Sequence, residues 1–303
     1  MTRHVTTTLA RQDAGQIPEQ LAQHAFEALI NEALLTPKPG LIDLRGGNAH
    51  HDMSLGLMCR SALTLKPWFN LMARRVTEQS DTFTQRKTLG TLGREAEQAM
   101  LDATSGINTH RGAIWALGLL VAGTAKAVTS ASGQLTPYAI ARHAAMLALC
   151  CDPNAPKATG HKGEMARRRY RVGGAKAQAQ AGFPHVLRVG LPTLHRSRHS
   201  GQSETSARLD TLLALIATLD DTCLLARGGL HALYGMQFRA RRTLTLGGSS
   251  TPNGWAALSS LNAWANRKRL SPGGAADLLA ATLFLDDLCN TSPTCRSTET
   301  WKN

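Results

Sequence analysis

The sequence predicts an all-α protein, a single compact multi-helix domain whose loops carry the polar chemistry. Alanine and leucine are abundant in the 303 residues, whereas aromatic residues make up only 5%. Apolar residues recur at helical spacing along most of the chain, and no segment alternates convincingly as a strand. We therefore expect a flexible N-terminal arm at 1–17, one helical domain at 18–290 and a polar C-terminal tail at 291–303.

The first half of this domain is predicted to contain five helices. Pro18 suits the start of the first helix, which must end before Pro37, and Pro67 is expected to close the second. The glycine-containing segment 106–110 separates the third helix from a strongly apolar fourth. The expected helices span 18–35, 53–65, 89–103, 111–128 and 137–151.

The second half is predicted to alternate loops with three further helices. Residues 152–163 are rich in Pro, Gly and Lys and are typical of a loop, whereas 195–207 is the most disorder-like internal segment. No internal repeat is present. The expected helices span 207–225, 255–267 and 275–288.

Charge and cysteine usage restrict the class of protein. The formal net charge of +13 and a pI near 10 suit nucleic acid, an anionic membrane surface or a small polyphosphate as partner. Six cysteines without a CxxC pair favour reduced thiols in a cytoplasmic protein. No signal-peptide region is seen and no apolar run approaches 18 residues, so we expect no membrane association. The sequence also lacks a Walker phosphate loop, a GxSxG elbow and a dinucleotide-binding GxGxxG in a βαβ context.

A polar loop at 36–53 is the first candidate site. Lys38 stands between two prolines, which hold the backbone extended and leave a point cation suited to phosphate. Asp43 and Asp52 offer carboxylate oxygens of the kind that magnesium accepts together with substrate phosphates. Asp52 could equally cap the helix that follows.

The same loop allows a second interpretation, a His/Asp metal-dependent phosphohydrolase. His50, His51 and Asp52 are consecutive, but this chemistry needs further ligands on separate helices. Nothing in the spacing of the available residues selects them. The residues that could be added are His24, His110 and Asp220.

A third group of polar residues precedes the apolar helix at 111–128. Glu95 and Asp102 are seven residues apart and so share a helix face beside an apolar stripe. Four polar residues then surround the start of the next helix: Asn108, Thr109, His110 and Arg111. Free N–H groups and Arg111 at that point would form an anion site, although Asn108 or Thr109 could simply cap the helix.

Three later segments also carry charge. The basic run 167–176 is typical of a solvated face or a nucleic-acid patch, but Tyr170 alone could stack on a base. Asp221 and Arg227, with the Gly-Gly pair that follows, could bind metal and phosphate or form a salt-bridged helix end. Asp277 lies in an apolar segment, where interaction with the helix dipole is the simplest explanation.

Together these segments resemble the triphosphoribosyl-dephospho-coenzyme A synthase family. Six motifs occur in order over nearly the whole chain, which makes the resemblance specific. The matching pieces are 36–43, 49–53, 106–113, 182–184, 221–222 with 227–229, and 274–279.

Finer details are most similar to the malonate decarboxylase branch rather than the citrate lyase branch. They are found in 59–62, 108–115 and 221–225. The chain departs from the family pattern at Asn48, Lys176 and Gln178. Lysine in place of arginine loses a bidentate phosphate contact, and a glutamine cannot act as a base or an anionic ligand.

The resemblance implies that ATP and 3'-dephospho-coenzyme A react to give 2'-(5''-triphosphoribosyl)-3'-dephospho-coenzyme A and adenine. A ribose 2'-hydroxyl would displace adenine from the anomeric carbon, which requires a proton acceptor and a group that helps the base leave. The residues expected to supply the base and magnesium ligands are Asp43, Asp52 and Asp221, with Glu95 in reserve. Phosphates and substrate would be bound by Lys38, Asn108, Arg111, Lys176 and Arg227, and the leaving base would be assisted by His50 or His110.

The resemblance also implies the partners. Magnesium is the expected cofactor, ATP and 3'-dephospho-coenzyme A are the substrates, and the product would pass to a separate carrier-protein transferase. No nucleic acid and no membrane are expected, and a homo-oligomer is left open. The alternatives are the phosphohydrolase and a basic, helical nucleic-acid-binding protein.

Overall fold

A computed structural model describes residues 15–46, 49–50, 52–129 and 135–291. These residues form twelve α-helices and no strand, which confirms the all-α prediction. Most of the predicted arm and tail, together with Asn48 and His51, lie outside the described residues. The helices are α1 (Ile17–Leu34), α2 (Leu55–Thr77), α3 (Thr82–Ala103), α4 (Arg111–Thr129), α5 (Pro137–Leu149), α6 (Lys162–Tyr170), α7 (Gly174–Gln180), α8 (Leu191–His199), α9 (Glu204–Thr218), α10 (Thr222–Thr245), α11 (Pro252–Arg267) and α12 (Gly273–Thr291), with a π-helical turn at Val186–Gly190 and a 3-10 turn at Gly248–Ser250.

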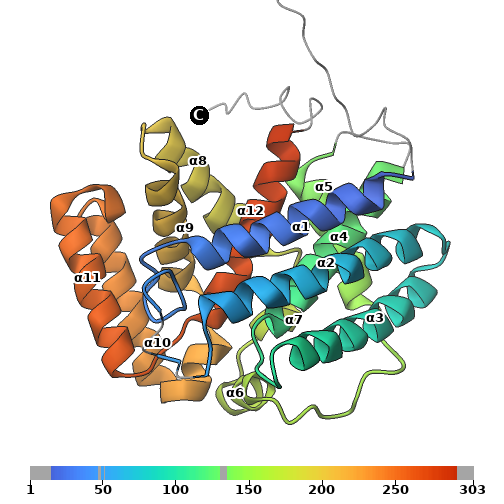
Figure 1. The fold of residues 1–303 in the computed structure, drawn as a ribbon, viewed down its shortest axis with the longest axis horizontal. Helices are drawn as coiled ribbons and strands as arrows, with labels where there is room; N and C mark the ends of the chain where they lie inside the picture. Colours follow the sequence, from blue (N-terminus) through green and yellow to red (C-terminus); the bar gives the residue numbers. More distant parts are fainter. Residues whose placement is uncertain (1–14, 47–48, 51, 130–134, 292–303) are drawn as a thin grey trace, which may run out of the picture.

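Helices α4 and α12 lie at the centre of the fold. α4 packs against α1, α2, α3, α5 and α12, while α12 also contacts α1 and α9 (Figure 1). Most residues of α4 are buried, because its sequence is apolar on every face. It is long and apolar enough by composition to cross a membrane, contrary to our reading of the sequence, but 72% of that window is buried in protein. This is the pattern of a core helix.

The second helix is longer than predicted. α2 continues through Pro67 to Thr77 and begins after Ser54, whose hydroxyl accepts from the N–H of Leu57. The prediction that Pro67 closes this helix is therefore wrong. The proline removes one backbone bond, to the carbonyl of Leu63, and Leu63 lies on the exposed face where water can replace that bond. Ser54, rather than Asp52, caps the helix.

The segment predicted to be disordered is helical. Residues 195–199 complete α8 and 204–207 begin α9, with a short connection at 200–203, and Ser203 caps α9 through the N–H of Ser206. Arg198 forms ion pairs with Asp286 of α12 and Glu204 of α9. These tertiary ion pairs hold a polar sequence in place, which composition alone does not reveal.

The predicted helix at 207–225 is two helices. α9 ends at Thr218, and Asp221 starts α10 by accepting from the N–H groups of Cys223 and Leu224. The Gly228–Gly229 pair interrupts α10: both residues have non-helical backbone angles, Gly229 with φ 64°, so the label α10 covers two helical segments joined by a kink. The basic run at 167–176, which we did not predict to be helical, contributes to α6 and α7.

Candidate functional site

Five polar residues from distant parts of the chain meet where α1 ends and where α4, α10 and α12 begin. We call them the polar cluster: Glu32, Lys38, His110, Asp221 and Asp277. The charge of Lys38 acts on His110, and the charges of Glu32 and Asp221 act on Asp277. The loop prediction therefore identified one side of this cluster, and the other sides come from the end of α1 and from the starts of α4, α10 and α12.

Lys38 is directed into the protein rather than towards solvent. Its side chain is 1% exposed, and Nζ donates to both Oε1 and the carbonyl oxygen of Glu32 at 2.6 Å. Its backbone N–H donates to Asp43 Oδ2 at 2.9 Å, while Arg45 pairs with the same carboxylate at 2.7 Å. A buried ion pair and a closed turn thus fix the loop, and the contacts of Asp43 lie within that loop.

The loop is also fixed from the far side. Gly40 has φ +71°, and a Cβ on it would lie 2.1 Å from the carbonyl oxygen of Leu270. Only glycine fits this conformation so close to another backbone segment. The contact connects the loop to the residues that lead into α12.

His110 is held by two hydroxyl groups. Ser61 Oγ of α2 lies 2.7 Å from His110 Nδ1, and the Thr109 hydroxyl donates to Ser61 Oγ at 2.7 Å. The residue is 3% exposed, and burial together with the charge of Lys38 lowers the pKa of His110 to about 3. The imidazole is therefore neutral at pH 7.

Asp221 joins two helix starts. Its Oδ1 accepts from Cys223 and Leu224 in α10, and its Oδ2 accepts from the N–H of Ala275 in α12 at 3.0 Å. The side chain is 1% exposed, and burial raises its pKa against the opposing effect of these three N–H groups. Asp221 therefore has a capping role, whatever else it does.

Asp277 lies against the first turn of α4. A Cβ on Gly112 would lie 1.9 Å from Asp277 Oδ2, and the N–H of Ala113 is bonded to the carboxyl group. Part of the residue remains accessible, although the carboxyl group is surrounded by protein. Burial, followed by the charges of Asp221 and Glu32, raises the pKa of Asp277 well above its usual range. The groups acting on Asp277 are acids and one N–H, with no neighbouring cation among them.

His50 and Arg227 form the outer edge of the site. His50 Nε2 lies 2.9 Å from Ser271 Oγ, and the guanidinium nitrogen Nη2 of Arg227 lies 3.3 Å from both ring nitrogens of His50. Burial, and then the charge of Arg227, lowers the pKa of His50 to about 4. Asp52 is 67% exposed, with Oδ1 4.0 Å from His50 Nδ1. Arg227 also donates to two backbone carbonyls and so braces this edge.

The remaining predicted residues lie on the surface around α4 and α7. Asn108 accepts from the N–H of Arg111, so it caps α4, and Arg111 pairs with Glu97 at 2.7 Å. Glu95 and Lys176 are exposed, on α3 and in the first turn of α7. The structure thus brings Lys38, His110 and Asp221 together and leaves these four outside the polar cluster.

Sequence reasoning missed two members of the arrangement and undervalued two others. Glu32 and Ser61 were not selected as site residues, Thr109 was named only beside an anion site or as a helix cap, and Asp277 was explained by a helix dipole. A glutamate near the end of an apolar helix and an aspartate in an apolar segment are the signals that could have found two of them, because buried acids need partners. Ser61 has no such signal, because a buried serine in a helix is common.

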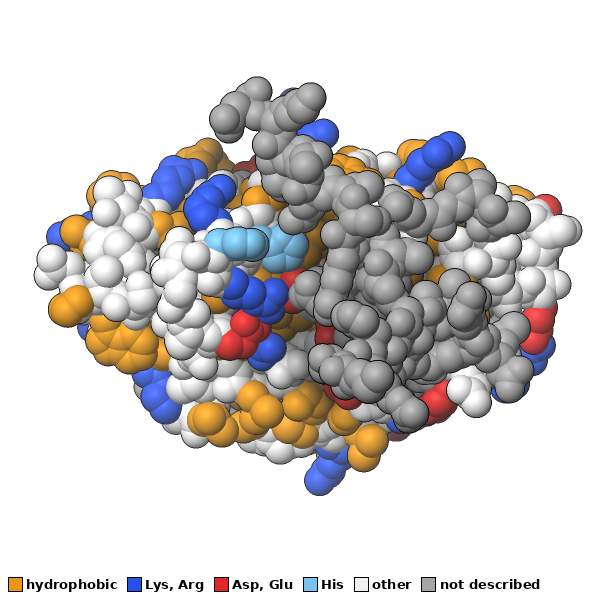
Figure 2. All heavy atoms as spheres, turned by 90° about the horizontal axis from the view of Figure 1, so that it is seen from above, with side chains coloured by type: hydrophobic (Ala, Val, Ile, Leu, Met, Phe, Trp, Pro, Cys, Tyr) orange, Lys and Arg blue, Asp and Glu red, His pale blue; other side chains and the backbone are white. Residues whose placement is uncertain are grey.

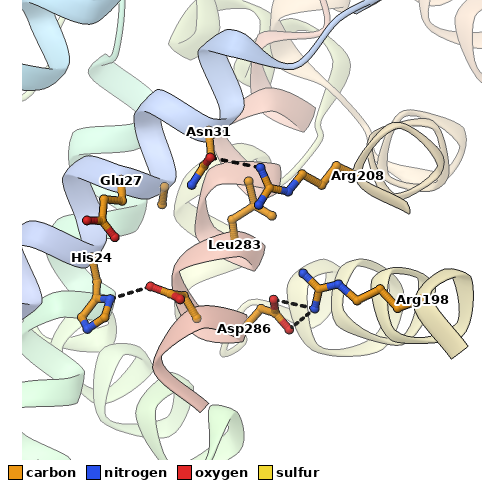
Figure 3. A pocket seen from close by; sticks show the side chains of 9 residues that line it. His24, Glu27, Asn31, Arg198, Arg208, Leu283 and Asp286 are labelled. Carbon is orange, nitrogen blue, oxygen red and sulfur yellow. Dashed lines mark hydrogen bonds and ion pairs between the residues drawn. The ribbon is translucent and has the colours of Figure 1, made fainter. Parts of the chain in front are cut away.

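A separate polar pocket of about 170 Å³ lies between α1, α8, α9 and α12 (Figure 3). In it, His24 Nδ1 lies 2.5 Å from Asp287 Oδ2, Arg198 pairs with Asp286, and Arg208 donates to Asn31. On α12 its residues lie at least six positions beyond Asp277, and on α1 they run from His24 to Asn31, which directly precedes Glu32. The pocket joins four helices by polar contacts.

The matched family model, described as "CitG: ATP:dephospho-CoA triphosphoribosyl transferase", covers residues 18–295. The chain belongs to this family. It is 50% identical over 266 residues to the "2-(5''-triphosphoribosyl)-3'-dephosphocoenzyme-A synthase" of Klebsiella pneumoniae, covering 88% of this chain and 93% of that protein. It is also 50% identical over 282 residues to the "Probable 2-(5''-triphosphoribosyl)-3'-dephosphocoenzyme-A synthase" of Pseudomonas paraeruginosa, covering 92% and 94%. No solved structure matches the chain.

Family membership and structure both leave the alternatives without support. Among the described residues, the one group of three side chains close enough to share a metal is His24, Glu27 and Asp287, not the set required by a phosphohydrolase. His110 is buried against Ser61, and His51 lies outside the described residues. The face in Figure 2 mixes basic, histidine, acidic and apolar side chains, rather than the continuous basic surface that nucleic acid favours.

Proposed function

We propose that this CitG-family chain transfers the triphosphoribosyl group of ATP to the 2'-hydroxyl of 3'-dephospho-coenzyme A and releases adenine. Its 50% identity to named synthases over most of both chains carries this proposal. The polar cluster supports it, because buried acids, a buried lysine and three helix N-termini meet at one place. Such a place can hold a triphosphate without needing to cleave it.

Magnesium is the proposed cofactor, and Asp221 and Asp277 are the residues that would hold it. The negative charges of Asp221 and Glu32 near Asp277 would favour a divalent cation. Magnesium is commonly bound by one or two carboxylates together with substrate phosphates. When bound, it would offset the charge of the triphosphate. We favour this pair over Asp43, which is engaged by Arg45 and the loop backbone.

Asp52 is the proposed acceptor of the ribose hydroxyl proton. It is the accessible carboxylate at the edge of the site, next to His50, and its exposure leaves room for the acceptor substrate. A carboxylate in that position can take the proton as the new C–O bond forms and the bond to adenine breaks. Arg227, which faces His50, is suited to a phosphate of either substrate.

The biological setting follows from the same proposal. We infer that the product serves malonate decarboxylase, since the motifs at 59–62 and 108–115 are most similar to that branch. The chain would work in the cytoplasm, where ATP and the coenzyme A precursor are available, and a carrier-protein transferase would take its product. Six cysteines without a CxxC pair are consistent with that compartment.

Adenine release tests the function directly. Purified chain is incubated with ATP, magnesium and 3'-dephospho-coenzyme A, and adenine and the triphosphoribosylated product are followed by chromatography. Adenine must appear only when the acceptor is present. Phosphate or ADP in its place would instead indicate a phosphohydrolase and contradict the proposal.

Two variants and a matched control locate the chemistry. Asp52→Asn removes the proposed proton acceptor, and Asp277→Asn replaces one oxygen of the proposed metal ligand by an amide nitrogen, so each is expected to reduce the rate at least about 100-fold while the fold is kept. Asp102→Asn changes an exposed carboxylate on α3 that accepts from Gln98, and it should leave the rate unchanged. Wild-type rates in both test variants would overturn these assignments.

A further inference from the structure

His110 has a buried nitrogen that the fold does not satisfy. Its Nε2 has no hydrogen-bond partner among the described residues, although the residue is only 3% exposed. Buried polar atoms in proteins are nearly always paired, so an exception needs an explanation. Neighbouring atoms cover Nε2, so an incoming acceptor must displace them.

The hydroxyl groups around His110 decide which ring nitrogen holds the proton. The Thr109 hydroxyl donates to Ser61 Oγ, and among the described residues the acceptor within reach of the single Ser61 proton is His110 Nδ1. Nδ1 is then an acceptor. The pKa of about 3 keeps the ring neutral, so its one proton lies on Nε2. The orphan nitrogen is therefore a donor, an N–H group without an acceptor.

The surroundings of this N–H favour a negatively charged acceptor. The positive charge of the Lys38 ammonium group acts on the imidazole ring, and this group donates two hydrogen bonds to Glu32. His110 also directly precedes the first residue of α4, where the helix dipole is positive. Because Glu32 offsets much of the Lys38 charge, an anionic oxygen near Nε2 would gain chiefly from the N–H group and the helix dipole, whereas a neutral ring nitrogen of adenine would gain mainly the hydrogen bond.

We propose that His110 Nε2–H binds an oxygen of the ATP triphosphate, and that Ser61 and Thr109 are positioning residues that fix the required tautomer. This inference rests on the proposed function, because it names the part of ATP that the buried histidine recognises. It moves His110 from the leaving base to the phosphates. His50, at the outer edge of the site, remains the histidine available to adenine.

Inorganic tripolyphosphate tests the inference without base, sugar or turnover. Its binding in the presence of magnesium is measured by calorimetry for two substitutions of His110. Asn can occupy the position of Nδ1 but has nothing at Nε2, whereas Gln can place an N–H near Nε2. We expect His110→Asn to weaken binding about tenfold or more and His110→Gln to retain part of the affinity.

The positioning residues need a spectroscopic readout. In protein labelled with 15N-histidine, His110 is assigned by comparison with His110→Asn, and its Nε2 should hold the proton. Ser61→Ala should lose this tautomer preference and weaken tripolyphosphate binding, and Ser61→Thr, which restores a hydroxyl, should recover both. Ser260→Ala, which removes an exposed hydroxyl on α11, is the matched control and should change neither.

The outcomes separate this inference from the proposed function. A proton on Nδ1 in the wild type, or unchanged tripolyphosphate binding in His110→Asn, would overturn the inference even if adenine is released. A loss of turnover rate in His110→Asn without a change in tripolyphosphate binding would also overturn it and return His110 to adenine. A chain that binds tripolyphosphate through His110 but releases no adenine would overturn only the proposed function.

Discussion

Gly112 offers a sensitive test of the position of Asp277. A Cβ at this residue would lie 1.9 Å from Asp277 Oδ2 and 2.8 Å from Cγ, so in Gly112→Ala the carboxylate must retreat by about 1 Å or more. A misplacement of about 1 Å in a reacting site can cost about 100-fold in rate, or about 2.7 kcal/mol. The stability should change less, since overpacking by about 1–3 kcal/mol is offset by about 1 kcal/mol of helix propensity.

Adenine release and thermal unfolding, measured together, separate the two effects. The matched control is Gly93→Ala on α3, where nothing lies within 4 Å of the added methyl group. The control should retain the wild-type rate and become slightly more stable. Gly112→Ala should remain folded and lose about two orders of magnitude in rate. A folded Gly112→Ala protein with the wild-type rate would refute the role of Asp277.

Three further predictions concern stability and are measured by urea unfolding. Asp221→Ala should lose about 2 kcal/mol because the caps of α10 and α12 are removed, whereas Asp221→Asn, which keeps an acceptor oxygen, should lose less. Lys38→Met should lose about 3–5 kcal/mol by leaving Glu32 buried without its partner, and adding Glu32→Gln should restore part of this. Because the folded pKa values of His110 and His50, about 3 and about 4, lie below the ordinary 6.5, the unfolded chain binds more protons between these limits. The unfolding free energy should therefore rise from pH 4 to 6.5 by up to about 1.4 kcal/mol per pH unit for each histidine, and His110→Asn should reduce the slope.

Specific results would contradict each of these predictions. Equal losses in Asp221→Ala and Asp221→Asn would show that the caps do not depend on the acceptor oxygen. Additive effects of the Lys38 and Glu32 substitutions would indicate that the two side chains do not interact. A stability profile in which His110→Asn keeps the full wild-type slope would show that this histidine does not titrate differently on folding.

Helices with a strong apolar period could be predicted from the sequence, but their ends could not. The apolar helix predicted at 111–128 is found as α4, whereas α2 runs ten residues beyond Pro67. Proline costs a helix one backbone bond, and whether the helix continues depends on packing against α1 and α3, which a local pattern does not contain. The polar helix α8 was missed for the same reason, because Arg198 finds its acids on other helices.

The candidate site was predictable only where its residues stand in unusual local sequence. Lys38 between two prolines and Asp221 shortly before an arginine and a Gly-Gly pair attract attention without any structure. The partner of Lys38 is Glu32, in the helix that ends just before the loop, whereas the partner of Asp221 is Ala275, in a helix that approaches only in the folded chain. The direction of Lys38 into the core could not be foreseen, because a lysine in a polar loop is usually solvated.

The polar cluster combines Glu32 from the first described helix with Asp277 from the last. Glu32 and Asp277 are therefore far apart in the sequence, and their interaction has a high contact order. The loss of chain entropy on closing this loop opposes formation of the polar cluster until α1 and α12 have docked. Partly folded chains would hold the other helices yet lack a working centre. A fragment ending before α12 should remain inactive until a separate α12 peptide restores the missing carboxylate.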